Sequence, residues 1–149
     1  LTGTGAISGL GNAAFTLSGL NAGTVNAVGF SGFTSADATH MAGANGFNDG
    51  AKSSGGMTFA QVTDVEGTGT ISNVAGRFDD GARKRTGGTI TYTGFDAVAG
   101  SGGQVVGVIG DFDLGSKASS ASGLNYSGFN LTSVSGNGSN GRMKERRLG

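Results

Sequence analysis

The stretch FDDGARKRTGGTITYTGFDAVAGSGGQVVGVIG, residues Phe78–Gly110, contains features that recur along the chain. It begins with Phe-Asp-Asp-Gly, continues through a short polar loop and a Gly-Gly pair, and then alternates through Thr89–Thr93. A Gly-Phe pair, Val98 and a second apolar run at Val105–Ile109 complete the unit. Because the same order of features recurs on both sides, we interpret this stretch as one copy of a degenerate repeat.

The other copies are aligned by their aromatic and aliphatic residues. Phe47, Phe78 and Phe112 each begin a copy, at nearly regular spacing. Several landmarks that share a period of about 30–35 residues are typical of stacked units or of a solenoid. The period predicts clear repeats at about 47–76, 78–110 and 112–138, preceded by a worn repeat at 5–46.

The local pattern favours strands over helices. The chain has 32 glycines in 149 residues, and each glycine costs a helix about 1 kcal/mol relative to alanine. In Thr89–Thr93, Ile90 and Tyr92 would point to one side and three threonines to the other, as in a half-buried strand. Proline is absent, which suits a ladder in which nearly every backbone N–H is paired, because proline cannot donate.

We therefore predict an all-β parallel β-helix, or solenoid, built from degenerate repeats of about 33 residues. Each repeat would form either one large coil or two smaller ones. Equivalent residues would lie above one another in the stack, in which neighbouring strands are about 4.8 Å apart. We expect Ile90 near Met57 and Leu124, and Phe95 near Val62 and Phe129. The predicted structural stack comprises Phe47, Phe78, Phe112, Val62, Phe95, Phe129, Met57, Ile90, Leu124, Val65, Val98 and Val134.

The N-terminal part is predicted to contain short strands at Ala6–Leu10, Ala14–Leu20 and Thr24–Phe30, the last two separated by a turn at Asn21–Gly23. Residues 34–46 are predicted to form a polar loop.

The clear repeats also share a basic segment. Lys52–Ser54, Arg83–Arg85 and Lys117–Ser120 occupy equivalent positions, and we expect a surface loop at each. We predict one solenoid domain over residues 1–138 and a flexible basic tail over residues 139–149.

The formal net charge is zero, but it is unevenly distributed. Arg142–Gly149 contains four of the ten basic and one of the ten acidic residues, so residues 1–141 carry 6 basic and 9 acidic groups, a net charge of −3. An acidic body gives no reason to expect a nucleic acid partner. No apolar run approaches the roughly 18 residues of a membrane span. The chain starts at Leu1 in the middle of the pattern, so we expect a segment of a longer, processed protein.

Candidates for catalysis are few. His40 is the only histidine and is interpreted as a solvated loop residue, because no nucleophile-elbow motif accompanies it. Asp79, Asp80, Asp111 and Asp113 are the carboxylates that a polysaccharide-degrading enzyme would use, but the Asp-Gly context favours surface turns. Cysteine is absent, and the glycine-rich turns match neither the calcium-binding nonapeptide nor a phosphate loop. We predict no catalytic, cofactor-binding or metal-binding residues.

Two surface patterns have alternative interpretations. Thr2–Thr4, Thr68–Thr70 and Thr89–Thr93 are candidates for the hydroxyl array of an ice-binding solenoid, although the next copy replaces Thr89 and Thr91 by Gly123 and Asn125. The cluster Arg83-Lys84-Arg85 is a candidate contact for an acidic polymer or lipid surface. Its equivalents carry one lysine each, which favours a solvated loop.

The stretches Leu17–Val25, Gly29–Thr34, Ile90–Phe95 and Val98–Gly103 resemble the repetitive regions of very large secreted bacterial proteins of the filamentous haemagglutinin type, which are exported by two-partner secretion. The likeness covers about residues 5–138 and is one of style, in which Gly/Ser/Thr-rich short strands are followed by Phe or Val. The resemblance implies a right-handed β-helix, a shaft without catalytic residues, and secretion, cell-surface display, adhesion and aggregation.

From these observations we expect a structural or adhesive segment of a secreted or cell-surface bacterial repeat protein, with no enzymatic activity and no cofactor. The expected partners are neighbouring repeats, other copies of the chain, and a host or cell-surface glycan. Open solenoid ends would present unpaired backbone groups and favour filaments. The alternatives are an ice-binding solenoid and a β-helical polysaccharide-degrading enzyme.

Overall fold

The computed structural model describes residues 1–131 and 134–141. Within these residues the chain forms nineteen strands and no helix. In chain order the strands are β1 (Ala6–Ile7), β2 (Phe15–Gly19), β3 (Ala22–Val25), β4 (Val28–Ser31), β5 (Ser35–Ala36), β6 (His40–Asn48), β7 (Ser53–Ser54), β8 (Met57–Thr58), β9 (Asp64–Val74), β10 (Phe78–Asp79), β11 (Lys84–Arg85), β12 (Thr91–Thr93), β13 (Ala97–Gly100), β14 (Val105–Val106), β15 (Val108–Gly110), β16 (Phe112–Asp113), β17 (Ala118–Ser119), β18 (Asn125–Ser127) and β19 (Gly136–Gly141).

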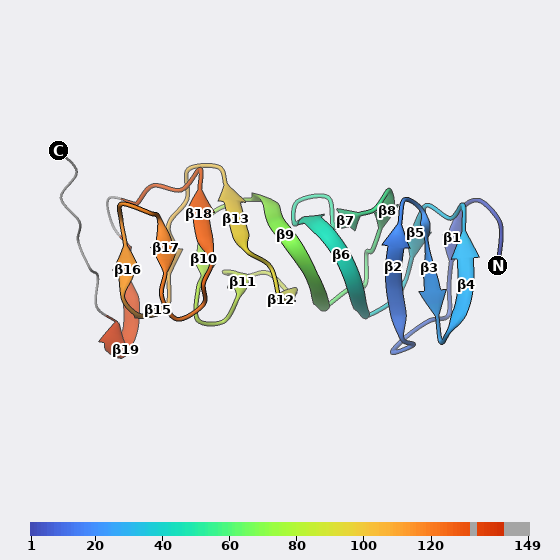
Figure 1. Ribbon diagram of the computed structural model, residues 1–149, viewed down its shortest axis with the longest axis horizontal. Helices are drawn as coiled ribbons and strands as arrows, with labels where there is room; N and C mark the ends of the chain where they lie inside the picture. The colour runs from blue at the N-terminus through green and yellow to red at the C-terminus, as the bar shows by residue number, and fades with distance from the viewer. Residues whose placement is uncertain (132–133, 142–149) are drawn as a thin grey trace.

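The strands wrap into the stacked coils of a β-solenoid of about five turns. This confirms the predicted all-β parallel solenoid. The molecule is elongated, with β4 at one end and β19 at the other (Figure 1). Parallel pairing of β2, β6, β9, β13 and β18 runs along its length.

The core consists of columns of buried side chains, one member from each turn. The first column contains Phe15, Met41, Val65 and Tyr92. The second column contains Phe47, Ile71, Val98 and Tyr126, and the third contains Phe78 and Val105. All ten residues are buried. Successive members of a column are closer together in the chain than equivalent residues of successive repeats.

The coil is therefore shorter than the sequence repeat, and the predicted pairing of equivalent residues is wrong. Val98 pairs with Ile71 and Tyr126 in the second column, whereas its sequence equivalent Val65 lies in the first column. Within a turn, the chain steps from Val65 in the first column to Ile71 in the second and then to Phe78 in the third. A sequence repeat thus covers one coil plus one step between columns, so each copy is rotated by one face relative to the copy before it.

The residues of the predicted stack nevertheless belong to the core. Eleven of the twelve are buried, and Phe129 is partly buried against the same cluster. The recurring apolar positions therefore face inward, as predicted. Where the ladder pairs them across turns, as at Val65 and Val98, their partners differ from the prediction.

Each rotated copy keeps the same local hairpin. The pairs Asn48–Ser53, Asp79–Lys84 and Asp113–Ala118 each close a four-residue loop. The first residue of each pair accepts a hydrogen bond from a loop N–H: Ala51 donates to Asn48 (2.9 Å), Ala82 to Asp79 (3.0 Å) and Gly115 to Asp113 (2.8 Å). Short polar side chains that bond their own turn explain why these positions recur.

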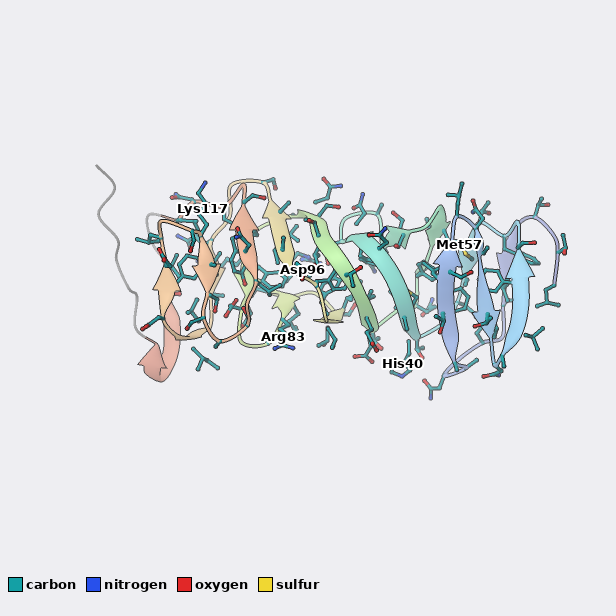
Figure 2. The ribbon with its side chains drawn as sticks, viewed as in Figure 1. His40, Met57, Arg83, Asp96 and Lys117 are labelled. Carbon is teal, nitrogen blue, oxygen red and sulfur yellow. The ribbon has the colours of Figure 1, made fainter. Side chains whose placement is uncertain are left out.

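The last residue of each loop is basic and left-handed. Lys52, Arg83 and Lys117 have φ of 53°, 55° and 57°, a conformation that side chains other than glycine and asparagine rarely adopt. Figure 2 shows Lys117 and Arg83 on opposite edges of the molecule, as the rotation of successive copies requires. The expected surface loops are confirmed at these tips, but Ser54 and Ser119, just beyond them, are buried.

A second local motif is a Gly-Phe corner. The rings of Phe33, Phe95 and Phe129 each cover a glycine of the preceding turn, namely Gly3, Gly67 and Gly100. A Cβ built on Gly67 would lie 2.9 Å from Phe95, and one built on Gly100 would lie 2.5 Å from Phe129. A side chain at Gly100 would collide with the Phe129 ring, and one at Gly67 would collide first with the Ala44 carbonyl oxygen.

Two N-terminal predictions are wrong. The single strand expected at Thr24–Phe30 is the hairpin of β3 and β4, which turns at Asn26 and Ala27 with φ of 48° and 68°. Residues 34–46, expected as a polar loop, contain β5 and most of β6. In β6 the register shifts at left-handed glycines such as Gly43, and these shifts disguise the alternation of a strand.

The predicted tail, residues 139–149, is described only in part. Residues 139–141 belong to β19, which pairs with β15. The remainder of the predicted tail, residues 142–149, lies outside the described residues.

Candidate functional site

The first polar site in the core is the Asp49 clamp, formed by Asp49, Arg85 and Tyr92. Asp49 opens the loop between β6 and β7 and is 8% exposed. Its Oδ1 accepts a hydrogen bond from the Tyr92 hydroxyl at 2.5 Å, and its Oδ2 accepts one from Arg85 Nε at 3.0 Å. The donors come from β12 and β11, so the clamp joins a hairpin of one repeat to strands of the next.

The second site is the Asp80 clamp, formed by Asp80, Ser119, Ser122 and Tyr126. Asp80 opens the loop between β10 and β11 and is 1% exposed. Its Oδ1 accepts hydrogen bonds from the Tyr126 hydroxyl at 2.5 Å and from Ser122 Oγ at 2.6 Å, and its Oδ2 accepts one from Ser119 Oγ at 2.7 Å. Three hydroxyl groups thus stabilise this carboxylate where the Asp49 clamp uses a cation and one hydroxyl.

The two clamps occupy equivalent positions of successive repeats. Asp80 follows Asp49 by one sequence repeat, and Tyr126 follows Tyr92 by one sequence repeat. The interpretation of Asp80 as a surface turn residue is therefore wrong: its backbone turns, but its carboxylate is buried because the next repeat supplies the donors.

The sequence contains a signal for these clamps in the distribution of its tyrosines and aspartates. Tyrosine occurs only in the two copies that follow a copy with aspartate at the position of Asp49. The first clear copy has Phe59 at the tyrosine position, and no acidic residue precedes Asp37. The last copy has Leu114 at the aspartate position. Each copy with aspartate at the position of Asp49 is therefore followed by a copy with tyrosine at the position of Tyr92.

The surroundings keep both phenols neutral. Burial is the main cause that raises the pKa of Tyr92 above its ordinary value, followed by its hydrogen bond to Asp49 and the charge of that carboxylate. Arg85 opposes this shift. Burial also raises the pKa of Tyr126, followed by the charge of Asp80 and the hydrogen bond to it. Neutral phenols donate to the carboxylates, so the clamps serve as cross-links between turns.

The other candidate carboxylates belong to turns. Asp79 and Asp113 cap separate hairpin loops through their Oδ1 atoms. Asp111 is exposed, and its backbone exchanges hydrogen bonds with the Ser120 hydroxyl. Three of the four aspartates proposed for glycan chemistry thus accept hydrogen bonds that the fold itself requires.

His40 lies on the outer face of β6 and not in a loop. Its Nδ1 is 2.7 Å from Oδ2 of Asp64 on β9, and both side chains are 53% exposed. Each is open to solvent, so the pair forms a surface contact between neighbouring turns.

Threonine does not form a continuous array on the outer face. In the ladder Thr91 lies beside Asp64 and Thr93 beside Glu66. Thr68 pairs with Asn45, and Thr70 pairs with Ala97. Charged, amide and methyl side chains therefore interrupt the hydroxyl rows, because the rotation of successive repeats places unlike residues above one another.

Within residues 1–131 and 134–141, no three His, Cys, Asp or Glu side chains are grouped as metal ligands would be. The same part of the chain has no helix that is long and apolar enough to cross a membrane.

Comparison of the chain with protein-family models, with curated proteins and with solved structures finds no match.

Proposed function

We propose that this chain is a structural segment of an extended β-solenoid, part of a secreted or cell-surface repeat protein of the adhesin type. The observation that carries the proposal is the pair of carboxylate clamps, each of which crosses from one repeat to the next. The most elaborate polar groups in the core are thus used to join turns.

The clamps suit this role for a physical reason. A solenoid is stabilised mainly by contacts between neighbouring units, and an apolar column allows small slips of one turn against the next. A buried carboxylate that accepts two or three hydrogen bonds tolerates no such slip, because each lost bond leaves a desolvated polar group. Clamps at Asp49 and Asp80 would keep a long shaft straight and in register.

The proposal includes association of the ends. The backbone groups at the first and last turns of a solenoid pair with further coils of a longer chain or with another copy. Such pairing would produce rods of variable length that project from a cell surface, and the exposed loops would make the adhesive contacts.

Negative-stain electron microscopy over a range of protein concentrations tests this function. We expect short rods in dilute solution and longer filaments of the same width as the concentration rises. Short rods at every concentration would contradict the association of ends. Thermal hysteresis in solution, or release of reducing sugars from a glycan, would overturn the structural role in favour of an ice-binding protein or an enzyme.

A further inference from the structure

We propose that the outer edge of the β10–β11 hairpin binds an acidic polysaccharide whose negative charges are carboxylates, such as a polyuronate. The residues concerned are Arg77, Arg83 and Lys84, which we call the basic edge. This adds a partner to the structural role and does not depend on it, since a rod that forms no filaments still presents the same edge.

The first observation is the concentration of charge. Four of the six basic residues in residues 1–141 lie within the short segment Arg77–Arg85. Arg85 is held by Asp49. The three residues of the basic edge form no ion pair with any residue that the structure describes.

The hairpin does not require these cations. The equivalent hairpins of the neighbouring copies have one lysine each, Lys52 and Lys117, and form the same four-residue loop. A basic residue at the loop position is therefore compatible with the fold in all three copies. The additional charge at Arg77 and Lys84 has no ion-pair partner within the described part of the chain.

The second observation is the position of the hairpin. β11 is the margin of the small sheet ordered β11–β10–β14. Phe78 is buried, and its partner across the hairpin, Arg85, reaches Asp49. Because side chains alternate along a strand, the neighbouring Arg77 and Lys84 face outward. Arg77 is exposed, and Lys84 is half-buried and lies across the hairpin from Asp79. Arg83 lies at the loop and points away from the strands at the lower edge of the molecule (Figure 2).

The third observation is the space around Arg83. Hollows of about 250 Å³ and about 200 Å³ adjoin the hairpin, and Arg83 and Ser122 line both of them. Phe95 and Leu124 contribute apolar surface to the first hollow, and Ile109 to the second. Together they offer room for a sugar ring beside Arg83. Asp80 also lines the second hollow, but it is 1% exposed and its carboxylate accepts hydrogen bonds from three hydroxyl groups.

The chemistry favours carboxylates on a polymer of moderate charge density. Two of the three cations are arginines, whose planar fork matches a carboxylate through two parallel hydrogen bonds. Anionic membranes usually need clusters of about four to eight cations, which the basic edge lacks. Duplex DNA carries one negative charge per about 1.7 Å of helix axis, so the 9 acidic groups of residues 1–141 would repel it more strongly than a polymer of lower charge density.

Isothermal titration of the full chain with polygalacturonate at low ionic strength tests the proposal, with neutral dextran as the control polymer. The test variant is Arg83→Gly/Lys84→Thr. The matched control is Lys52→Gly/Lys117→Gly, which removes the same number of charges from equivalent hairpins. We expect the wild type to bind polygalacturonate and not dextran, the test variant to bind about tenfold more weakly, and the control to bind within about twofold of wild type.

A third variant, Arg83→Lys, keeps the positive charge but removes the planar guanidinium group that can donate two parallel hydrogen bonds to a carboxylate. It is expected to lose about threefold in affinity.

Equal losses in the test and control variants would overturn the proposal, because the attraction would then be a property of net charge. It would also be overturned if polygalacturonate failed to bind the folded wild-type protein, or if phosphatidylserine vesicles or duplex DNA bound while polygalacturonate did not. Far-UV circular dichroism verifies that each variant is folded, and Arg83→Lys alone decides the matter if the double variant does not fold.

Discussion

The Asp49 clamp and the Asp80 clamp are built from equivalent positions, yet they stabilise their carboxylates by different means. Asp49 has a cationic partner, Arg85, whose side chain is 35% exposed, whereas Asp80 is 1% exposed and has only hydroxyl partners. At the position of Arg85 the next repeat has Ser119, which is buried. The clamp that reaches solvent thus uses a long cation, and the enclosed clamp uses short hydroxyl side chains that lose little rotamer entropy.

The comparison indicates that the common part of the device is the carboxylate–tyrosine bond, and that the remaining donors follow from the degree of burial. A buried carboxylate needs donors on both oxygens, and both clamps satisfy this. Five measurements on the two clamps test this view, beginning with the largest expected effect.

Removal of the two carboxylates should have the largest effect on stability. Asp80→Ala removes three hydrogen bonds to a fully enclosed charge and should lower the free energy of unfolding by about 3–5 kcal/mol. Asp49→Ala removes two, and Arg85 can then turn to solvent, so we expect about 2–3 kcal/mol. Urea denaturation followed by far-UV circular dichroism measures both. A larger loss for Asp49→Ala would contradict the assigned role of burial.

Alkaline pH should break both clamps together. Because the folded protein raises the pKa of Tyr92 and Tyr126, their stabilisation is complete below the ordinary tyrosine pKa of about 10 and is lost as the pH rises above it. Each phenol should lower the free energy of unfolding by about 1.4 kcal/mol per pH unit in that range.

Absorbance of the phenolate band measures this directly, because these two residues are the only tyrosines and the chain has no tryptophan. We expect phenolate to appear only as the β-sheet signal disappears, and the pH dependence to halve in Tyr126→Phe. Ionisation near the ordinary tyrosine pKa with the sheet intact would show that the phenols are not enclosed.

Removal of a single hydroxyl should have a smaller effect. Tyr126→Phe should cost about 2 kcal/mol, because water cannot replace the lost donor beside Asp80. Tyr92→Phe should cost about 1 kcal/mol, since the Asp49 clamp is partly open to solvent through Arg85. The difference is read from denaturation midpoints at equal slope, and equal costs would argue that the two sites are equally enclosed.

Arg85→Ser converts the first clamp toward the second and should cost about 1 kcal/mol, a modest value because Arg85 is partly exposed to screening. The loss should shrink as salt is added. Lys84→Ser, one residue away and without an ion pair in the described part of the chain, is the control and should change stability little. A loss unaffected by salt would indicate that Arg85 acts mainly through packing.

The smallest change in stability is expected in the hairpin loops that begin at Asp49 and Asp80. Lys52→Gly and Arg83→Gly should each raise stability by about 0.5 kcal/mol, because relief of the left-handed strain slightly exceeds the entropy that glycine adds to the unfolded chain. Thermal unfolding should show similar small increases for both. A decrease in either melting temperature would show that the long side chain stabilises its loop.

Much of the local structure was accessible from the sequence. The alternation around Ile90 and Tyr92, the Asp-Gly loops ending at Lys52, Arg83 and Lys117, and the Gly-Phe pairs each depend on residues close together in the chain. The strands, hairpins and corners therefore recur wherever the local motif recurs, and the inward-facing residues of the predicted stack are almost all in the core.

The sequence by itself thus determined a β-solenoid with a repeating local plan, while the tertiary structure decided how the turns lie on one another. Register depends on the number of residues that each turn uses between columns. Left-handed glycines such as Gly43 and Gly46 shift the register and interrupt the alternation by which a strand is predicted from sequence. The coil therefore closes before a full sequence repeat has passed. The clamps depend on this coil length, because it brings the tyrosine hydroxyl of the next repeat to the buried turn aspartate.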